Sequence, residues 1–134
     1  PELNEQLIVI QNILFSVGGN LATDTSLKEV RSGLAVTDED VAFLEKAMDR
    51  MDETLPPMTH FILPGGEQAS SFAHIARTVC RRAERRVLDV AAQYDVDDRV
   101  VRYINRLSDY LFVLARKLAF DAGAEELKWE VPRK

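Results

Sequence analysis

Residues 100–118 read VVRYINRLSDYLFVLARKL, and this stretch decides the fold. Its large apolar side chains recur at alternating steps of four and three residues, at Val100, Ile104, Leu107, Leu111, Leu114 and Leu118. This spacing places them on one side of an α-helix and is typical of a helix packed in a bundle. Gly123 follows at a position where glycine commonly ends a helix. We therefore expect a long amphipathic helix here.

The same pattern predicts a helix at the start of the chain and another in its middle. The first has an apolar side made of Leu3, Leu7, Ile10, Leu14, Val17 and Leu21. The second begins at Thr37, whose hydroxyl can cap a helix, and ends before Pro56–Pro57, which cannot continue one. Its expected core residues are Val41, Leu44, Met48 and Met51.

A third, longer helix is expected from about residue 67 to residue 94, after the turn formed by residues 64–66. Its expected core residues are Phe72, Ile75, Val79, Ala83, Val87 and Val90. Four long amphipathic helices with short links predict an all-α fold, an antiparallel helix bundle. At 134 residues and 15.1 kDa the chain fits a single domain, residues 1–134.

The composition excludes several classes of protein. No run of 18 or more apolar residues occurs, so no membrane span is expected. A net charge of −5 argues against binding to nucleic acid or to an anionic membrane surface. The single cysteine, Cys80, excludes an intrachain disulfide and a cysteine-based zinc site.

Motifs for the commonest chemistry of helix bundles are missing. Neither His60 nor His74 has a glutamate three residues before it, so we expect no ferritin-like metal site. The sequence also contains no nucleophile elbow, Walker P-loop or dinucleotide-binding glycine motif. The prediction is therefore that no metal is bound by protein ligands.

The charge is concentrated in one segment of the third predicted helix. Residues 74–86 hold five arginines and one glutamate, for a net charge of +4. His74, Arg77, Arg81 and Glu84 share one helix face because their spacing is three, four and three. The segment is either a solvated face, with Glu84 paired to Arg81, or an anion site, since guanidinium forks suit phosphate. The first N–H groups of this helix could also hold an anion.

The fourth predicted helix carries polar residues beside its apolar stripe. Asn105, Ser108 and Phe112 line one face. They are either surface residues, with Asp109 and Arg116 forming a weak pair, or polar and aromatic contacts to a bound ligand. The sequence alone leaves both readings open.

Four linked motifs resemble one known family. They are FILPGG at 61–66, HIAR at 74–77, RRAERR at 81–86 and NRLSDYLF at 105–112, and residues 10–15 and 21–23 are similar too. In order and spacing they resemble the PduO-type ATP:cob(I)alamin adenosyltransferases. The resemblance covers essentially the whole chain.

The resemblance implies a five-helix bundle that assembles as a homotrimer, with active sites between subunits. It implies transfer of the 5′-deoxyadenosyl group of ATP to the cobalt of cob(I)alamin, with magnesium, and release of triphosphate. Such a reaction requires oriented reactants and neutralisation of the leaving triphosphate rather than a protein base.

The resemblance also implies roles for single residues. Arg77 corresponds to an arginine that forms an intersubunit salt bridge, and we expect it to act in catalysis together with Arg81. The ATP-binding positions are Arg81, Arg82, Glu84, Arg85 and Asn105, with Ser108 as a further polar contact. Phe61 corresponds to a phenylalanine that keeps the lower face of cobalt free of a ligand, and Phe112 to an aromatic residue near the corrin.

The family's phosphate loop and the segment with the salt-bridge aspartate should precede Pro1. We therefore expect that the chain lacks an N-terminal ATP-loop segment of a full enzyme. The alternatives are a truncated, non-catalytic module that binds a corrinoid or polyphosphate, and a helical interaction protein whose arginines only bridge subunits. A cytoplasmic location is expected, or a mitochondrial one if a transit peptide has been removed.

Overall fold

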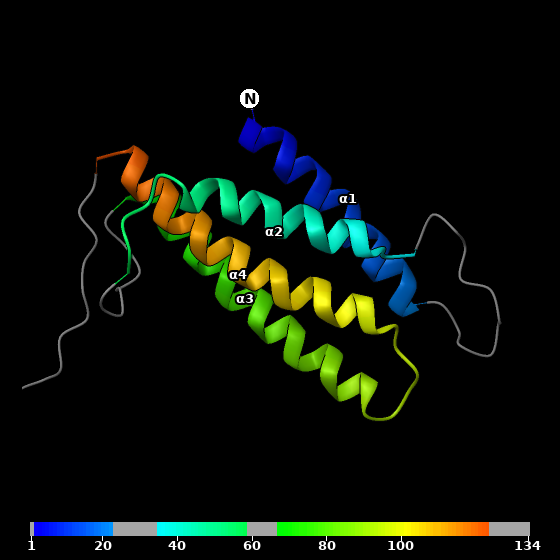
Figure 1. The fold of residues 1–134 in the computed structure, drawn as a ribbon. Helices are drawn as coiled ribbons and strands as arrows, with labels where there is room; N and C mark the ends of the chain where they lie inside the picture. The colour runs from blue at the N-terminus through cyan, green and yellow to red at the C-terminus, as the bar shows by residue number, and fades with distance from the viewer. Residues whose placement is uncertain (1, 23–34, 59–66, 124–134) are drawn as a thin grey trace, which may run out of the picture.

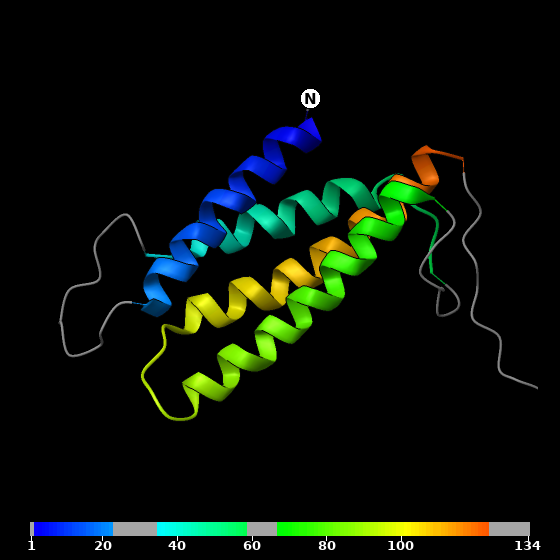
Figure 2. The ribbon, with the colours of Figure 1, turned by 180° about the vertical axis from the view of Figure 1, so that it is seen from behind.

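The computed structural model describes residues 2–22, 35–58 and 67–123. These ranges form four helices, α1 (Glu2–Ala22), α2 (Asp38–Asp52), α3 (Gln68–Ala91) and α4 (Asp98–Asp121), and contain no strand. Successive helices run in opposite directions, as Figures 1 and 2 show from two sides. The prediction of an all-α antiparallel bundle is therefore confirmed for the described part of the chain.

The helix α4 is the centre of the bundle. Both α3 and α2 pack along it, and α1 is joined to it by the Tyr110 hydroxyl, which donates to Gln6 Oε1 at 2.8 Å. An ion pair between Arg50 and Glu2 links α1 to α2. Tyr103 and Tyr110 of α4 are both fully buried. The stretch that decides the fold is thus the one that the other helices cover.

Local signals place the helix ends. Thr37 caps α2 with a full capping box: its hydroxyl accepts from the Asp40 N–H at 3.2 Å, and its own N–H donates to the Asp40 carboxylate at 2.9 Å. Asp97 caps α4 by accepting from the Arg99 N–H at 2.9 Å. Gly123 follows α4 with a positive φ of 74°, a conformation that glycine adopts at little cost. The predicted third helix is shorter than expected, because α3 ends at Ala91.

The expected core residues of α2 and α4 are confirmed. All four apolar residues predicted for α2 are buried. On α4, Val100, Ile104, Leu107 and Leu114 are buried, while Leu111 and Leu118 are partly buried against the core. On α1 the stripe is less well covered, since Ile10 and Val17 are buried but Leu14 remains 40% exposed.

The expected core face of α3 is wrong. Of the six predicted core residues only Val87 is buried, whereas Phe72 is 62% exposed and Ile75 is 58% exposed. Val79, Ala83 and Val90 are exposed as well. The residues that α3 buries are Ser70, Ala73, His74, Cys80 and Val87.

A physical reason for this difference lies in side-chain size. Ser70 and Cys80 are small enough to let the α3 and α4 backbones approach each other. The Ser70 hydroxyl donates to the Ala115 carbonyl at 2.7 Å, and the Cys80 thiol donates to the Ile104 carbonyl at 3.4 Å. Packing against α4 therefore uses the small and polar side of α3, and its large apolar side faces outward.

Candidate functional site

The residues singled out on the third and fourth predicted helices meet along the α3–α4 pair. Glu84 of α3 and Asn105 of α4 form a direct link, in which the Asn105 Nδ2 donates to Glu84 Oε2 at 2.7 Å. The expected alternative, in which Glu84 pairs with Arg81, is wrong. The Glu84 carboxylate is thus held against α4, where it lines a pocket together with Asn105, Arg102 and Arg106.

Phe112 of α4 joins two residues of α3. The guanidinium carbon of Arg77 lies 5.5 Å from the centroid of the Phe112 ring, which is a cation–π distance. The ring of His74 meets the same phenylalanine edge to face, with centroids 6.2 Å apart and an angle of 69° between the planes. The site thus contains a compact contact of His74, Phe112 and Arg77.

His74 and Arg77 each carry a buried nitrogen that no described residue satisfies. These atoms are His74 Nδ1 and Arg77 Nε. His74 is only 5% exposed, and burial together with the positive charge of Arg77 lowers its pKa below the usual value. The imidazole is therefore neutral at pH 7.

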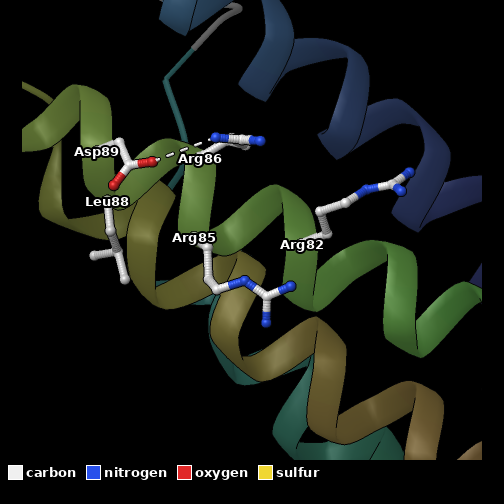
Figure 3. Close-up of a pocket in the computed structure, with 5 residues that line it drawn as sticks. All are labelled: Arg82, Arg85, Arg86, Leu88 and Asp89. Carbon is white, nitrogen blue, oxygen red and sulfur yellow. Dashed lines mark ion pairs between the residues drawn. The ribbon is translucent and has the colours of Figure 1, made fainter.

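The other arginines of α3 point toward solvent. Arg81, Arg82 and Arg85 are exposed and form no ion pair within the described ranges, and Arg86 reaches Asp89 only at 3.8 Å. Arg82, Arg85, Arg86, Leu88 and Asp89 border a shallow depression of about 440 Å³ on α3 (Figure 3). In that view Arg82 and Arg85 both extend away from the helix axis. Such unpaired guanidinium groups can bind an anion.

Ser108 lies deeper than expected. It is 8% exposed, so little of it is accessible to a ligand in this structure.

Neighbouring Asp109 pairs with Arg106 of its own helix, and the expected pair with Arg116 is therefore wrong. Arg116 is instead buried and donates to the Pro56 carbonyl at 2.8 Å.

The N-terminus of α3 is not open to a ligand anion. The Glu67 carboxylate accepts from the N–H groups of Ala69 and Ser70, at 3.0 and 2.8 Å. These two hydrogen bonds lower the pKa of Glu67. The expectation that the first N–H groups hold a bound anion is therefore wrong, because the chain supplies its own carboxylate there.

Phe61 and Cys80 are the two remaining residues that bear on the site. Phe61 lies outside the described residues, as does the turn at 64–66. Cys80 is buried, and burial, helped by the charge of Glu84, raises the pKa of its thiol to about 11, so the thiolate nucleophile is scarce at pH 7.

The described ranges show neither a metal site formed by side chains nor a helix that could span a membrane. They contain no group of three or more histidine, cysteine, aspartate or glutamate side chains placed to share a metal ion. In the same ranges, every helix is too short or too polar to cross a bilayer. Sequence reasoning missed the contacts of His74 and Arg77 with Phe112, the Glu84–Asn105 hydrogen bond and the contact of Arg116 with Pro56. Only the spacing of His74 and Arg77 hinted at the first of these.

Comparison with known proteins relates the chain to one family. Residues 1–118 match the family described as cobalamin adenosyltransferase. The corrinoid adenosyltransferase of Bacillus subtilis (strain 168) is 41% identical over 129 residues, which are 96% of this chain and 65% of that protein. The corrinoid adenosyltransferase MMAB of Mus musculus is 43% identical over 124 residues, which are 91% and 52% of the two chains. The chain thus spans between about half and two thirds of the length of these relatives.

Solved structures agree with the sequence comparison. A variant of the PduO-type ATP:corrinoid adenosyltransferase from Lactobacillus reuteri, complexed with cobalamin and ATP, superimposes with a TM-score of 0.89 at 32% identity. The alignment covers 96% of this chain and 71% of that one. Another variant from the same organism, complexed with ATP, gives a TM-score of 0.84 at 32% identity.

Proposed function

Because the chain belongs to the cobalamin adenosyltransferase family, we propose that it transfers the 5′-deoxyadenosyl group of ATP to the cobalt of cob(I)alamin. The observation that carries this proposal is the set of exposed guanidinium groups at Arg81, Arg82 and Arg85, which form no ion pair with any residue that the structure describes, beside the Glu84–Asn105 hydrogen bond. These groups are placed to receive a polyphosphate.

The reaction requires one bond to form and one to break. Cobalt(I) supplies the electron pair that forms the new cobalt–C5′ bond, the bond between C5′ and the phosphate oxygen of ATP breaks, and triphosphate leaves with the electron pair of the broken bond. No proton has to move at the reacting carbon, so the protein's task is to orient the reactants and stabilise the charge of the leaving group.

The arginines fit this task. In the proposed complex, Arg81, Arg82 and Arg85 contact the triphosphate, since a guanidinium donates two parallel hydrogen bonds to phosphate oxygens. Asn105 and Glu84 hold α3 and α4 in register beside the nucleotide, at 2.7 Å from each other. Magnesium fits as a companion of ATP, because Mg²⁺ commonly binds through substrate phosphates, few carboxylates and water.

The apolar side of the site is assigned to the corrin. Phe112 presents a partly exposed ring that is already in contact with Arg77. In our proposal this ring packs near the corrin, and Phe61 blocks the lower face of cobalt. Cobalt without a lower ligand is easier to reduce to the reactive state. Ser108, which is 8% exposed, would add a polar contact only after local rearrangement.

We also propose that the working form is a homotrimer. The outward side of α3 exposes Phe72, Ile75 and Val79, which are 62%, 58% and 48% accessible. Contiguous apolar surface of this kind commonly marks a protein interface. Arg77 on the same helix would then pair with an aspartate of the neighbouring subunit, which would make each active site a shared one.

The direct test is an adenosyl-transfer assay with the full-length protein. Chemically reduced cob(I)alamin and ATP should yield adenosylcobalamin, measured from its visible spectrum, together with an equal amount of triphosphate. Arg81→Lys serves as the site variant, and Arg99→Lys, at an exposed arginine of α4 to which no role in the site is assigned, serves as the control. If the protein binds ATP and corrinoid but never forms the cobalt–carbon bond, the alternative of a non-catalytic binding module replaces our proposal.

A further inference from the structure

His74 has no assigned role, although it touches the proposed site. It lies one turn before Arg77 on α3 and packs edge to face against Phe112 of α4, with ring centroids 6.2 Å apart. The same Phe112 ring lies 5.5 Å from the guanidinium carbon of Arg77. Phe112 is therefore held by His74 and in turn supports Arg77.

One nitrogen of the imidazole makes no hydrogen bond to the residues that the structure describes. Its Nδ1 is buried and has no partner within the described part of the chain. Burying a polar atom without a partner destabilises the folded state, a cost that an apolar side chain of similar size would not carry. His74 does make an aromatic contact with Phe112.

The charge state of His74 is compatible with this contact. Burial and the neighbouring Arg77 both lower its pKa, so the ring is neutral at pH 7. A neutral ring does not repel the Arg77 guanidinium and does not compete with it for the face of Phe112.

We propose that His74 is a positioning residue that fixes the orientation of the Phe112 ring and, through it, the direction of the Arg77 guanidinium. The consequence for adenosyl transfer rests on the proposed function, because Arg77 and Phe112 are there assigned to the shared active site. The positioning itself is a property of the protein without ligands, so it can be measured separately.

The first experiment observes Arg77 directly by NMR in the ligand-free full-length protein. Arginine labelled with ¹⁵N at Nε gives one Nε–Hε signal per ordered guanidinium, and the Arg77 signal is the one missing in Arg77→Lys. The ring current of Phe112 shifts this signal away from those of the exposed arginines. His74→Leu should move it toward them, whereas His74→Phe, which restores an aromatic contact, should leave it near its original position.

A matched control separates positioning from loss of packing. Cys80→Ala also shortens a buried side chain of α3, but Cys80 contacts Ile104 of α4 and not Phe112. It should leave the Arg77 signal in place. If His74→Leu does not yield folded protein, His74→Gln, which likewise has no aromatic ring, carries the same expectation. The proposal is overturned if the Arg77 signal does not shift in His74→Leu or His74→Gln. It is also overturned if the signal shifts by the same amount in Cys80→Ala.

The second experiment asks whether His74 acts through Arg77 during turnover. His74→Leu should lower kcat/KM by about fivefold, as expected from the loss of an aromatic pair. In an Arg77→Lys background the same change should have less than about a twofold effect, because the group that His74 positions has already been altered. If the fold-changes in kcat/KM of His74→Leu and Arg77→Lys simply multiply in the double variant, the two residues act independently and the proposal is contradicted. A wild-type protein with no activity would instead contradict the proposed function, and the NMR result would still decide the role of His74.

Discussion

Replacing Arg81 should separate the activity of this protein from its stability. Arg81 is exposed, forms no ion pair within the described ranges, and lies one helical turn from both Arg77 and Arg85. As part of a triphosphate site it contributes to binding, but as one of three stacked like charges it opposes folding. We therefore expect Arg81→Lys and Arg81→Gln to differ in an informative way.

The magnitudes follow from the geometry of α3. Lysine keeps the charge but cannot form two parallel hydrogen bonds, so Arg81→Lys should lower kcat/KM for ATP by at least about tenfold, or roughly 1.4 kcal/mol. Like charges at a spacing of four residues cost about 0.2–0.5 kcal/mol per pair. Arg81→Gln removes two such pairs and should raise the free energy of unfolding by about 0.4–1 kcal/mol, while Arg81→Lys should leave it nearly unchanged.

Two measurements test these values. Adenosyl transfer is followed by the visible spectrum at limiting ATP, and stability is followed by urea unfolding at low ionic strength. Arg99→Lys and Arg99→Gln are the matched controls, since Arg99 is also an exposed helical arginine without an ion pair in the described part of the chain. Added salt should reduce the gain in stability of Arg81→Gln, because exposed charges are screened.

Two results would refute the reasoning. An unchanged rate for Arg81→Lys at limiting ATP would make Arg81 part of a solvated helix face. A loss of stability in Arg81→Gln would mean that the arginines do not repel one another as their spacing on α3 implies.

Four further predictions follow from the sequence and the structure. Phe61→Ala should leave ATP affinity intact but let a lower ligand reach cobalt, which the visible spectrum of bound cob(II)alamin reports; an unchanged spectrum in a destabilised variant would reduce Phe61 to a packing residue. Sedimentation should give a species near three times the chain mass, and a strict monomer at micromolar concentration would exclude a shared site. Thr37→Ala, which removes the capping box of α2, should lower the urea-derived free energy of unfolding by about 1 kcal/mol, and no loss would mean that solvent replaces the cap. Because the pKa of His74 is lowered in the folded protein, the unfolded chain binds protons more readily, so stability should fall as pH drops below about 6.5, and less so in His74→Phe; equal slopes in both proteins would contradict this.

The sequence by itself determined which of the described ranges form helices and where most of these helices end. Thr37 caps α2 and Gly123 follows α4 as expected, because caps and glycines act on the residues beside them. The apolar stripe of α4 was also predictable, since a helix that packs on several sides has little choice of which residues to bury. His74, Arg77, Arg81 and Glu84 could be placed on one helix face for the same reason of local geometry.

Only the tertiary structure decided which side of α3 faces α4. Periodicity favoured Phe72 and Ile75, yet α3 buries Ser70 and Cys80, which make hydrogen bonds to α4 carbonyls. An apolar stripe shows that some surface needs covering, but it does not show whether this chain or another one covers it.

The contacts that build the candidate site were likewise beyond the sequence. Glu84 meets Asn105 across 21 positions of chain, and Arg77 meets Phe112 across a still longer separation. Such pairs depend on how far α3 is rotated about its own axis against α4, and that rotation is set by the packing of the whole interface. Local spacing can place residues on one helix face, whereas the identity of the residues they meet is a property of the folded bundle.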